Sequence, residues 1–114
     1  MVSIDVVLDG EGILRSCRVH GHAGAGKRGA DMVCAAVSVL VRTACRTLSG
    51  RKGITVRGEA PGRGLLWIEA DYTAEGRDFL FAAGAYLLEG LSSVAEEYPA
   101  HCTLTITGGG KYGA

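Results

Sequence analysis

The stretch that decides the fold is residues 21–38, GHAGAGKRGADMVCAAVS, because the spacing of apolar residues changes within it. Before it, residues 13–21 alternate between apolar and polar side chains, as a strand with one buried face does. From Asp31 to Leu48, apolar residues recur every three or four positions, which predicts a helix. Asp31 is a residue type that caps helix N-termini. The residues between strand and helix, 22–30, are too rich in glycine and other small residues for regular structure, and we expect a loop.

The rest of the chain divides in the same way. Residues 2–8 predict a first strand that ends at the turn Asp9-Gly10-Glu11-Gly12. Residues 53–59 and 64–71 predict two further strands joined by a turn at Ala60-Pro61-Gly62-Arg63. A second helix is expected over residues 75–97, and a last strand begins at Cys102 and alternates through Ile106. The inward side of the second helix is expected to consist of Phe79, Ala83, Tyr86, Leu87, Leu91 and Val94.

The element order β-β-α-β-β-α-β predicts an α+β fold, with two helices packed on a largely antiparallel sheet. The chain has 114 residues, enough for one hydrophobic core. We therefore expect a single domain over residues 1–107 and a flexible glycine-rich tail over residues 108–114.

Composition excludes several classes of function. Twelve basic and twelve acidic residues cancel, so no bulk attraction toward nucleic acid or an anionic membrane is expected. No apolar run approaches the roughly 20 residues that a membrane-spanning helix needs. The first nine residues lack the basic segment of a signal peptide, so we expect a cytoplasmic protein whose four cysteines are reduced thiols.

One of these thiols has neighbours suited to chemistry. On a helical wheel that starts at Asp31, Cys34 falls at the edge of the buried stripe, and Asp31 and Ser38 flank it toward solvent. Cys34 is also expected in the first helical turn, where free N–H groups and the helix macrodipole favour a thiolate. His22 ends the preceding strand, and an eight-residue loop can bring it back to Cys34 as a general base.

The other cysteines lack this environment. Cys17 and Cys102 lie on apolar strand faces and are expected to be small buried hydrophobes. Cys45 shares the wheel position of Cys34 but lies near the C-terminal end of the helix, where the dipole disfavours a thiolate. Asp31 has two open interpretations: a helix cap, or a residue that also orients His22, although its charge opposes a thiolate at Cys34.

Other residues of the chain suggest three alternatives to a catalytic thiol. Gly24, Gly26 and Gly29 spell G-x-G-x-x-G, but the preceding strand belongs to a hairpin and no acidic residue follows at the required distance, so nucleotide binding is a weak alternative. Cys17, His20 and His22 lack a second pair of ligands for zinc. A third alternative is a non-catalytic module that binds RNA through a basic cluster, although a solvated face that complements the C-terminal end of the first helix is the favoured interpretation of these residues. The cluster consists of Arg42, Arg46, Arg51, Lys52 and Arg57.

These residues carry a family resemblance. Gly21-His22-Ala23, then Gly26, Gly29, Asp31 and Val33-Cys34-Ala35-Ala36-Val37-Ser38 resemble the signature of the Prp family, the ribosomal-processing cysteine proteases of bacteria. The spacing of eleven residues between histidine and cysteine, together with D-x-x-C-A-A-V-S, is its specific part. The length and element order are also similar, so the resemblance covers nearly the whole chain.

The resemblance implies a cytosolic cysteine endopeptidase, usually a homodimer, with Cys34 as the nucleophile and His22 as the general base. Its family role is to remove a short N-terminal extension from the precursor of large-subunit ribosomal protein twenty-seven, after an aromatic residue, so that the ribosome matures. The resemblance implies no metal or organic cofactor, and we expect no direct nucleic-acid contact.

Other positions match the family pattern with less defined roles. Asp31 and Ser38 match as supporting residues whose roles the resemblance does not assign. In the family, the loop that holds Gly24, Gly26 and Gly29 here closes over the substrate.

Overall fold

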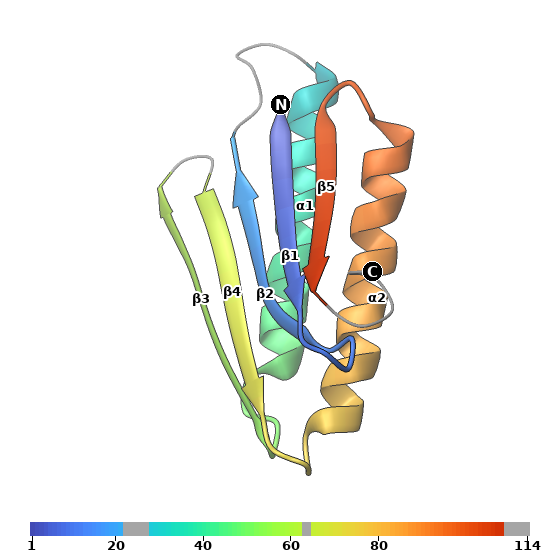
Figure 1. Cartoon of the computed structure of the whole chain (residues 1–114). Coiled ribbons are helices and arrows are strands. Elements are labelled where there is room, and N and C mark those ends of the chain that lie inside the picture. Colours follow the sequence, from blue (N-terminus) through green and yellow to red (C-terminus); the bar gives the residue numbers. More distant parts are fainter. Residues whose placement is uncertain (22–27, 63–64, 109–114) are drawn as a thin grey trace.

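A computed structural model describes residues 1–21, 28–62 and 65–108. Within these ranges the elements follow the predicted order (Figure 1). They are β1 (Val2–Leu8), β2 (Leu14–His20), α1 (Arg28–Leu48), β3 (Ile54–Gly62), β4 (Leu65–Tyr72), α2 (Arg77–Glu97) and β5 (Cys102–Gly108).

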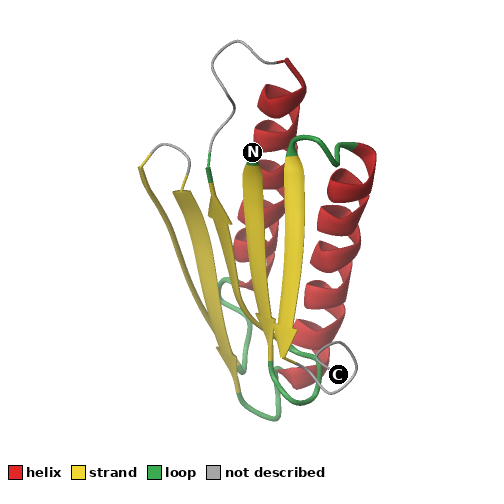
Figure 2. Ribbon diagram, turned by 45° about the horizontal axis from the view of Figure 1, so that its top comes forward, coloured by secondary structure: helices red, strands yellow, loops and turns green. Residues whose placement is uncertain are grey.

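The five strands form one sheet in the order β3-β4-β2-β1-β5. Neighbouring strands are antiparallel except β1 and β5, which run parallel because α2 carries the chain back across the sheet. Both helices cover the same face of this sheet (Figures 1 and 2), and the opposite face carries exposed polar side chains such as Asp5, Arg18 and Thr105. The predicted α+β fold, with two helices on a largely antiparallel sheet, is confirmed.

The core lies between the sheet and the helices. Every second residue of β1, from Val2 to Leu8, points into it, and α1 contributes the fully buried Val33, Val37 and Val41 at helical spacing. Burial of these apolar side chains is the main stabilising contribution to such a two-layer fold. Because Val33 is anchored in this way, the next residue, Cys34, is held at one edge of the layer interface.

The inward side of α2 differs in part from the prediction. Leu87 and Leu91 are buried as expected, but the side chain of Tyr86 is 79% exposed. Leu80 and Gly84 are buried instead, because the buried stripe follows the spacing 80, 84, 87 and 91 and turns position 86 toward solvent.

Three element boundaries also differ. The helix α1 begins at Arg28, so the predicted loop is shorter, and Asp31 lies in the first turn rather than at the N-cap. The strand β3 extends to Gly62, which pairs with Leu65, so the predicted turn at residues 60–63 begins too early. Gly108 belongs to β5, where it pairs with Leu8, and not to the tail. In the two strands, pairing with a neighbour extends the element beyond what local residue preference indicates.

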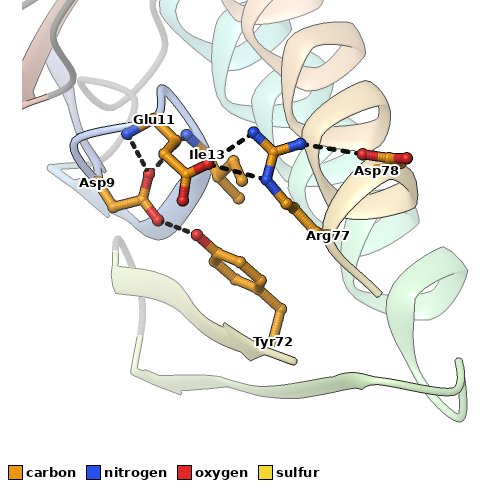
Figure 3. Close-up of polar contacts among 6 residues, drawn as sticks. All are labelled: Asp9, Glu11, Ile13, Tyr72, Arg77 and Asp78. Atoms are coloured by element: carbon orange, nitrogen blue, oxygen red, sulfur yellow. Dashed lines mark hydrogen bonds and ion pairs between the residues drawn. The ribbon is translucent and has the colours of Figure 1, made fainter. Parts of the chain in front are cut away.

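A polar network closes the end of the fold that holds the β1–β2 turn (Figure 3). Asp9 accepts hydrogen bonds from the backbone N–H groups of Glu11 and Ile13 and from the hydroxyl of Tyr72. Arg77, at the start of α2, donates to Glu11 and Asp78. The network therefore ties the turn to β4 and to α2.

The Asp9 and Tyr72 side chains change each other's acidity. Partial burial acts to raise the pKa of Asp9, but the hydrogen bonds from Tyr72 and from the turn backbone outweigh it and lower that pKa below its ordinary value. The same hydrogen bond to Asp9 raises the pKa of Tyr72 to about 12.

Candidate active site

Cys34 lies in the N-terminal third of α1. This helix begins at the end of the sheet where β2 finishes, whereas the β1–β2 turn lies at the opposite end (Figure 1). The side chain of Cys34 is half-buried and free of any disulfide, next to the fully buried Val33. Asp31, one turn earlier, is exposed, and Ser38, one turn later, is half-buried. The predicted placement of Cys34 at the rim of the core is confirmed.

The predicted depth of Cys34 in the helix is wrong. Because α1 begins at Arg28, Cys34 is its seventh residue and lies in the second turn. Only the first four N–H groups of a helix lack partners within it, so the backbone N–H of Cys34 is not one of the free groups. The acidic side chain of Asp31 occupies the first turn, where it complements the helix macrodipole.

The structure separates Cys34 from two inert thiols. Cys17 is completely buried, and burial together with the charge of Asp5 raises the pKa of its thiol to about 12. Cys102 is buried at the start of β5, and burial raises the pKa of its thiol as well. Both predictions are confirmed. Cys45, like Cys34, is half-buried and lies three helical turns further along α1.

The proposed general base lies outside the described residues. This holds for His22, Gly24 and Gly26, whereas Gly29 lies in the first turn of α1 and not in the loop predicted for it. The pairing of His22 with Cys34 therefore stays a prediction.

The backbone that leads to His22 is described up to Gly21. This residue has a φ of +86°, and a Cβ at its position would overlap the carbonyl oxygen of Met1. Glycine is therefore required at the end of β2 for two reasons, the left-handed conformation and the close backbone approach. Gly21 belongs to the sequence motif, but nothing in the local sequence pattern indicates this structural role.

The two neighbouring candidates for a metal site lie on opposite faces. Cys17 is buried beneath the sheet, whereas His20 is exposed on the open face, with its Nε2 3.6 Å from Oδ2 of Asp5. Among the described residues, no group of three or more histidine, cysteine, aspartate or glutamate side chains is arranged to hold a metal ion.

The basic cluster is divided by the fold. The guanidinium of Arg51 stacks 3.8 Å from the ring centroid of Phe79. Two more cations form ion pairs, Lys52 with Glu75 and Arg57 with Glu69. Arg42 and Arg46 instead line a groove between α1 and the β3–β4 hairpin. Three of the five cations therefore contact other residues of the protein, and the remaining two line the groove.

Comparison with known proteins identifies the family. The family model described as cysteine protease Prp matches residues 1–103. Two solved structures with the same fold are SMU.848 from Streptococcus mutans and the essential ribosomal processing protease Prp from S. aureus, in complex with a substrate peptide. The first is 28% identical, with a TM-score of 0.77 and 95% of each chain covered. The second is 21% identical, with a TM-score of 0.79, covering 94% of this chain and all of that one.

A third structure is the S. aureus protease in complex with a covalently linked product peptide, at 22% identity and a TM-score of 0.77, covering 94% of this chain and all of that one. No significant match is found among the curated proteins. In the described part of the chain, no helix is both long and apolar enough to cross a membrane. The match over residues 1–103 spans every element that positions Cys34, and the chain belongs to the Prp family of cysteine proteases.

Proposed function

We propose that this cysteine protease is an endopeptidase in which Cys34 is the nucleophile and His22 the general base. The observation that carries the proposal is the position of Cys34, a half-buried thiol at the rim of the core, within the region that matches the family. The buried Cys17 and Cys102 are unsuited to this role, since the thiolate form of a cysteine is the nucleophile.

The proposed reaction has two steps. His22 takes the proton from the Cys34 thiol, the sulfur attacks the scissile carbonyl carbon, and the C–N bond breaks as the leaving amine receives that proton. The acyl group is then held as a thioester. Water, deprotonated by His22, attacks the thioester, which releases the carboxylate product and restores the thiol.

We propose a ribosomal protein precursor as the substrate. The S. aureus structures contain a substrate peptide and a covalently linked product peptide, and both support a peptide substrate and a covalent step in the present protein. The finer proposal, from the family resemblance, is that the protein removes a short N-terminal extension, after an aromatic residue, from large-subunit ribosomal protein twenty-seven. Because bacterial ribosomes assemble in the cytoplasm, we also propose that the protein acts there.

The supporting residues have narrower proposals. Ser38 lies one turn after Cys34 on the same side of α1, and Asp31 lies almost one turn before Cys34 with an exposed side chain. Both residues are therefore suited to position the loop or the substrate. Gly24 and Gly26 stay as proposed substrate-loop residues, on the basis of the sequence pattern alone.

The homodimer is also a proposal. The family resemblance supports it, and the edge strand β5 is a suitable surface. Its sequence CTLTITG has no charged residue or proline, whereas the opposite edge strand β3 has Arg57, Glu59 and Pro61, which discourage pairing. Light scattering with size-exclusion chromatography measures the mass, and the variant Thr105→Lys is expected to weaken a dimer formed through β5.

The test of the protease function is the variant Cys34→Ala. We expect it to abolish cleavage of the extended ribosomal protein, and to leave the circular dichroism spectrum and the mass in solution unchanged. The control is Cys17→Ala, a cysteine that is buried beneath the sheet and does not line the groove, which is expected to retain cleavage. Equal cleavage by Cys34→Ala and the parent would overturn the proposal.

A further inference from the structure

A groove of about 400 Å³ runs between α1 and the β3–β4 hairpin. Arg42, Cys45 and Arg46 form its wall on α1, and Glu59 belongs to its wall on β3. Leu66 and Ile68 of β4, which are almost completely buried, contribute apolar surface at its base. The groove thus combines apolar surface with charged walls.

α1 and β3 approach each other closely within this groove. A Cβ on Gly58 would stand 3.2 Å from Sγ of Cys45 and 2.9 Å from Ile68. Arg42 lies almost one turn nearer to the start of α1 than Cys45 does. Among the residues that line the groove, Arg42 is therefore the one on α1 that lies nearest to Cys34.

Cys34 lies on the same side of α1 as this groove. The helix positions 34, 38, 41 and 45 follow the spacing of one stripe, and Cys34, Ser38 and Cys45 are all half-buried along it. At a rise of about 1.5 Å per residue, Arg42 stands about 12 Å along the axis from Cys34, and Arg46 about 18 Å. An extended peptide covers those distances in about four and five residues.

The charges in the groove favour one kind of peptide side chain. Arg42 and Arg46 are exposed, and no ion pair with another described residue engages either guanidinium. The other three cations of the basic cluster are stacked or paired within the protein. Two arginines on the α1 wall against one carboxylate, Glu59, give the lining of the groove a net positive charge.

We infer that this groove binds the substrate peptide at a distance from the cleaved bond, and that it selects an acidic side chain about four to five residues away. The peptide would lie extended along α1, with its carboxylate against Arg42 and Arg46 and its apolar side chains over Leu66. The inference rests on the proposed function, because it takes Cys34 as the nucleophile next to which the cleaved peptide bond lies.

Cleavage of paired peptides tests the selection. The peptides share one cleavage site and carry Asp or Lys four and five residues from it, in one series before the bond and in another after it. In one of the series we expect the parent to cleave the Asp peptide with a kcat/KM about two- to fivefold higher, the range for one exposed ion pair. The variant Arg42→Glu/Arg46→Glu is expected to reverse the preference.

The matched control is Lys52→Glu/Arg18→Glu, which changes the net charge equally at two exposed positions outside the groove and is expected to keep the parent's preference. Equal cleavage of Asp and Lys peptides by the parent, together with an inactive Cys34→Ala variant, would overturn the groove inference and leave the protease function standing. Cleavage by Cys34→Ala would instead overturn the protease function.

A binding experiment tests the groove without catalysis. In the Cys34→Ala variant, Cys45 is the only cysteine that is not buried, and it lies in the groove wall. A saturating concentration of the preferred Asp peptide is expected to slow the alkylation of Cys45 by N-ethylmaleimide, as measured by mass spectrometry. An unchanged rate while the peptide is bound would show that the peptide lies elsewhere, and would overturn the inference.

Discussion

Gly21 lies so close to Met1 that a Cβ at position 21 would overlap the Met1 carbonyl oxygen. This contact holds the end of β2 against the start of β1, directly before His22. The positive φ of Gly21 then sets the direction in which the chain leaves the sheet.

The variant Gly21→Ala is therefore expected to lower the free energy of unfolding by more than about 1–2 kcal/mol, the cost of the left-handed conformation alone for a residue with a Cβ. Urea denaturation measures this change. If His22 is the base, kcat/KM falls as well. The control is Gly10→Ala, since Gly10 has no positive φ and no atom within 4 Å of the added Cβ. Equal stabilities of the two variants would contradict the prediction.

The four thiols are expected to fall into two classes of reactivity. Cys34 and Cys45 are half-buried, whereas Cys17 and Cys102 are buried, and burial raises the pKa of both of these thiols. Titration of the folded protein with Ellman's reagent should detect two thiols, and titration in denaturant should detect four. Cys34→Ala and Cys45→Ala should each remove one accessible thiol. A Cys17→Ala variant that lost an accessible thiol would contradict this assignment.

The fold was predictable because most elements carry a strong local pattern. The alternation in β1 and the three- and four-residue spacing in α1 each follow directly from burial on one face. Boundaries were less predictable, because Gly62 and Gly108 belong to strands only through pairing with Leu65 and Leu8. The parallel pairing of β1 with β5 was also not predictable, because it depends on where α2 returns the chain to the sheet and not on the residues of either strand.

The site was predictable only where one helix determines it. The rim position of Cys34 follows from its angle to Val33 and Val37 on the same helix. The groove was not predictable, since its walls come from Cys45 and Gly58, which approach each other only after α1 packs against β3. The same packing divides the basic cluster, because the stacking of Arg51 on Phe79 joins residues from different elements.

Stability is expected to fall in alkaline solution because of Cys17. Its pKa is about 12 in the folded protein against 9.0 for an ordinary thiol, so between these values the unfolded state loses a proton that the folded state keeps. The stabilising contribution of the protonated Cys17 thiol is therefore fully present below pH 9. Above pH 9 the free energy of unfolding decreases, by at most about 1.4 kcal/mol per pH unit.

The variant Cys17→Ala is expected to be less stable at pH 7, because it leaves a small cavity, but to lose less stability between pH 9 and 11. Urea denaturation across this range measures both slopes, and the difference between them isolates Cys17 from other groups such as Tyr72. Val19→Ala, which shortens a buried side chain of the same strand without removing a titratable group, serves as the control that keeps the slope of the parent. Identical slopes for the parent and Cys17→Ala would show that the thiol of Cys17 ionises normally in the folded protein.

The Asp9 network is expected to stabilise the fold without taking part in catalysis. Asp9→Asn keeps the shape of the side chain but replaces the charged carboxylate, which accepts hydrogen bonds from Tyr72 and the turn backbone, with a neutral amide. We expect a loss of about 1 kcal/mol at pH 7, at the low end for bonds to a charged group because the site is only partly buried.

The pH dependence follows from the lowered pKa of Asp9. A carboxylate with a lowered folded pKa contributes its full stability above the ordinary value of 3.8, and this contribution is lost as the pH falls through the folded pKa. The difference between the parent and Asp9→Asn should therefore shrink below pH 3.8. Asp9 lies in the β1–β2 turn, at the opposite end of the sheet from the start of α1, which holds Cys34 (Figure 1). Peptide cleavage at pH 7 should therefore be retained. A loss of cleavage in folded Asp9→Asn would mean that this end of the fold also contributes to the reaction.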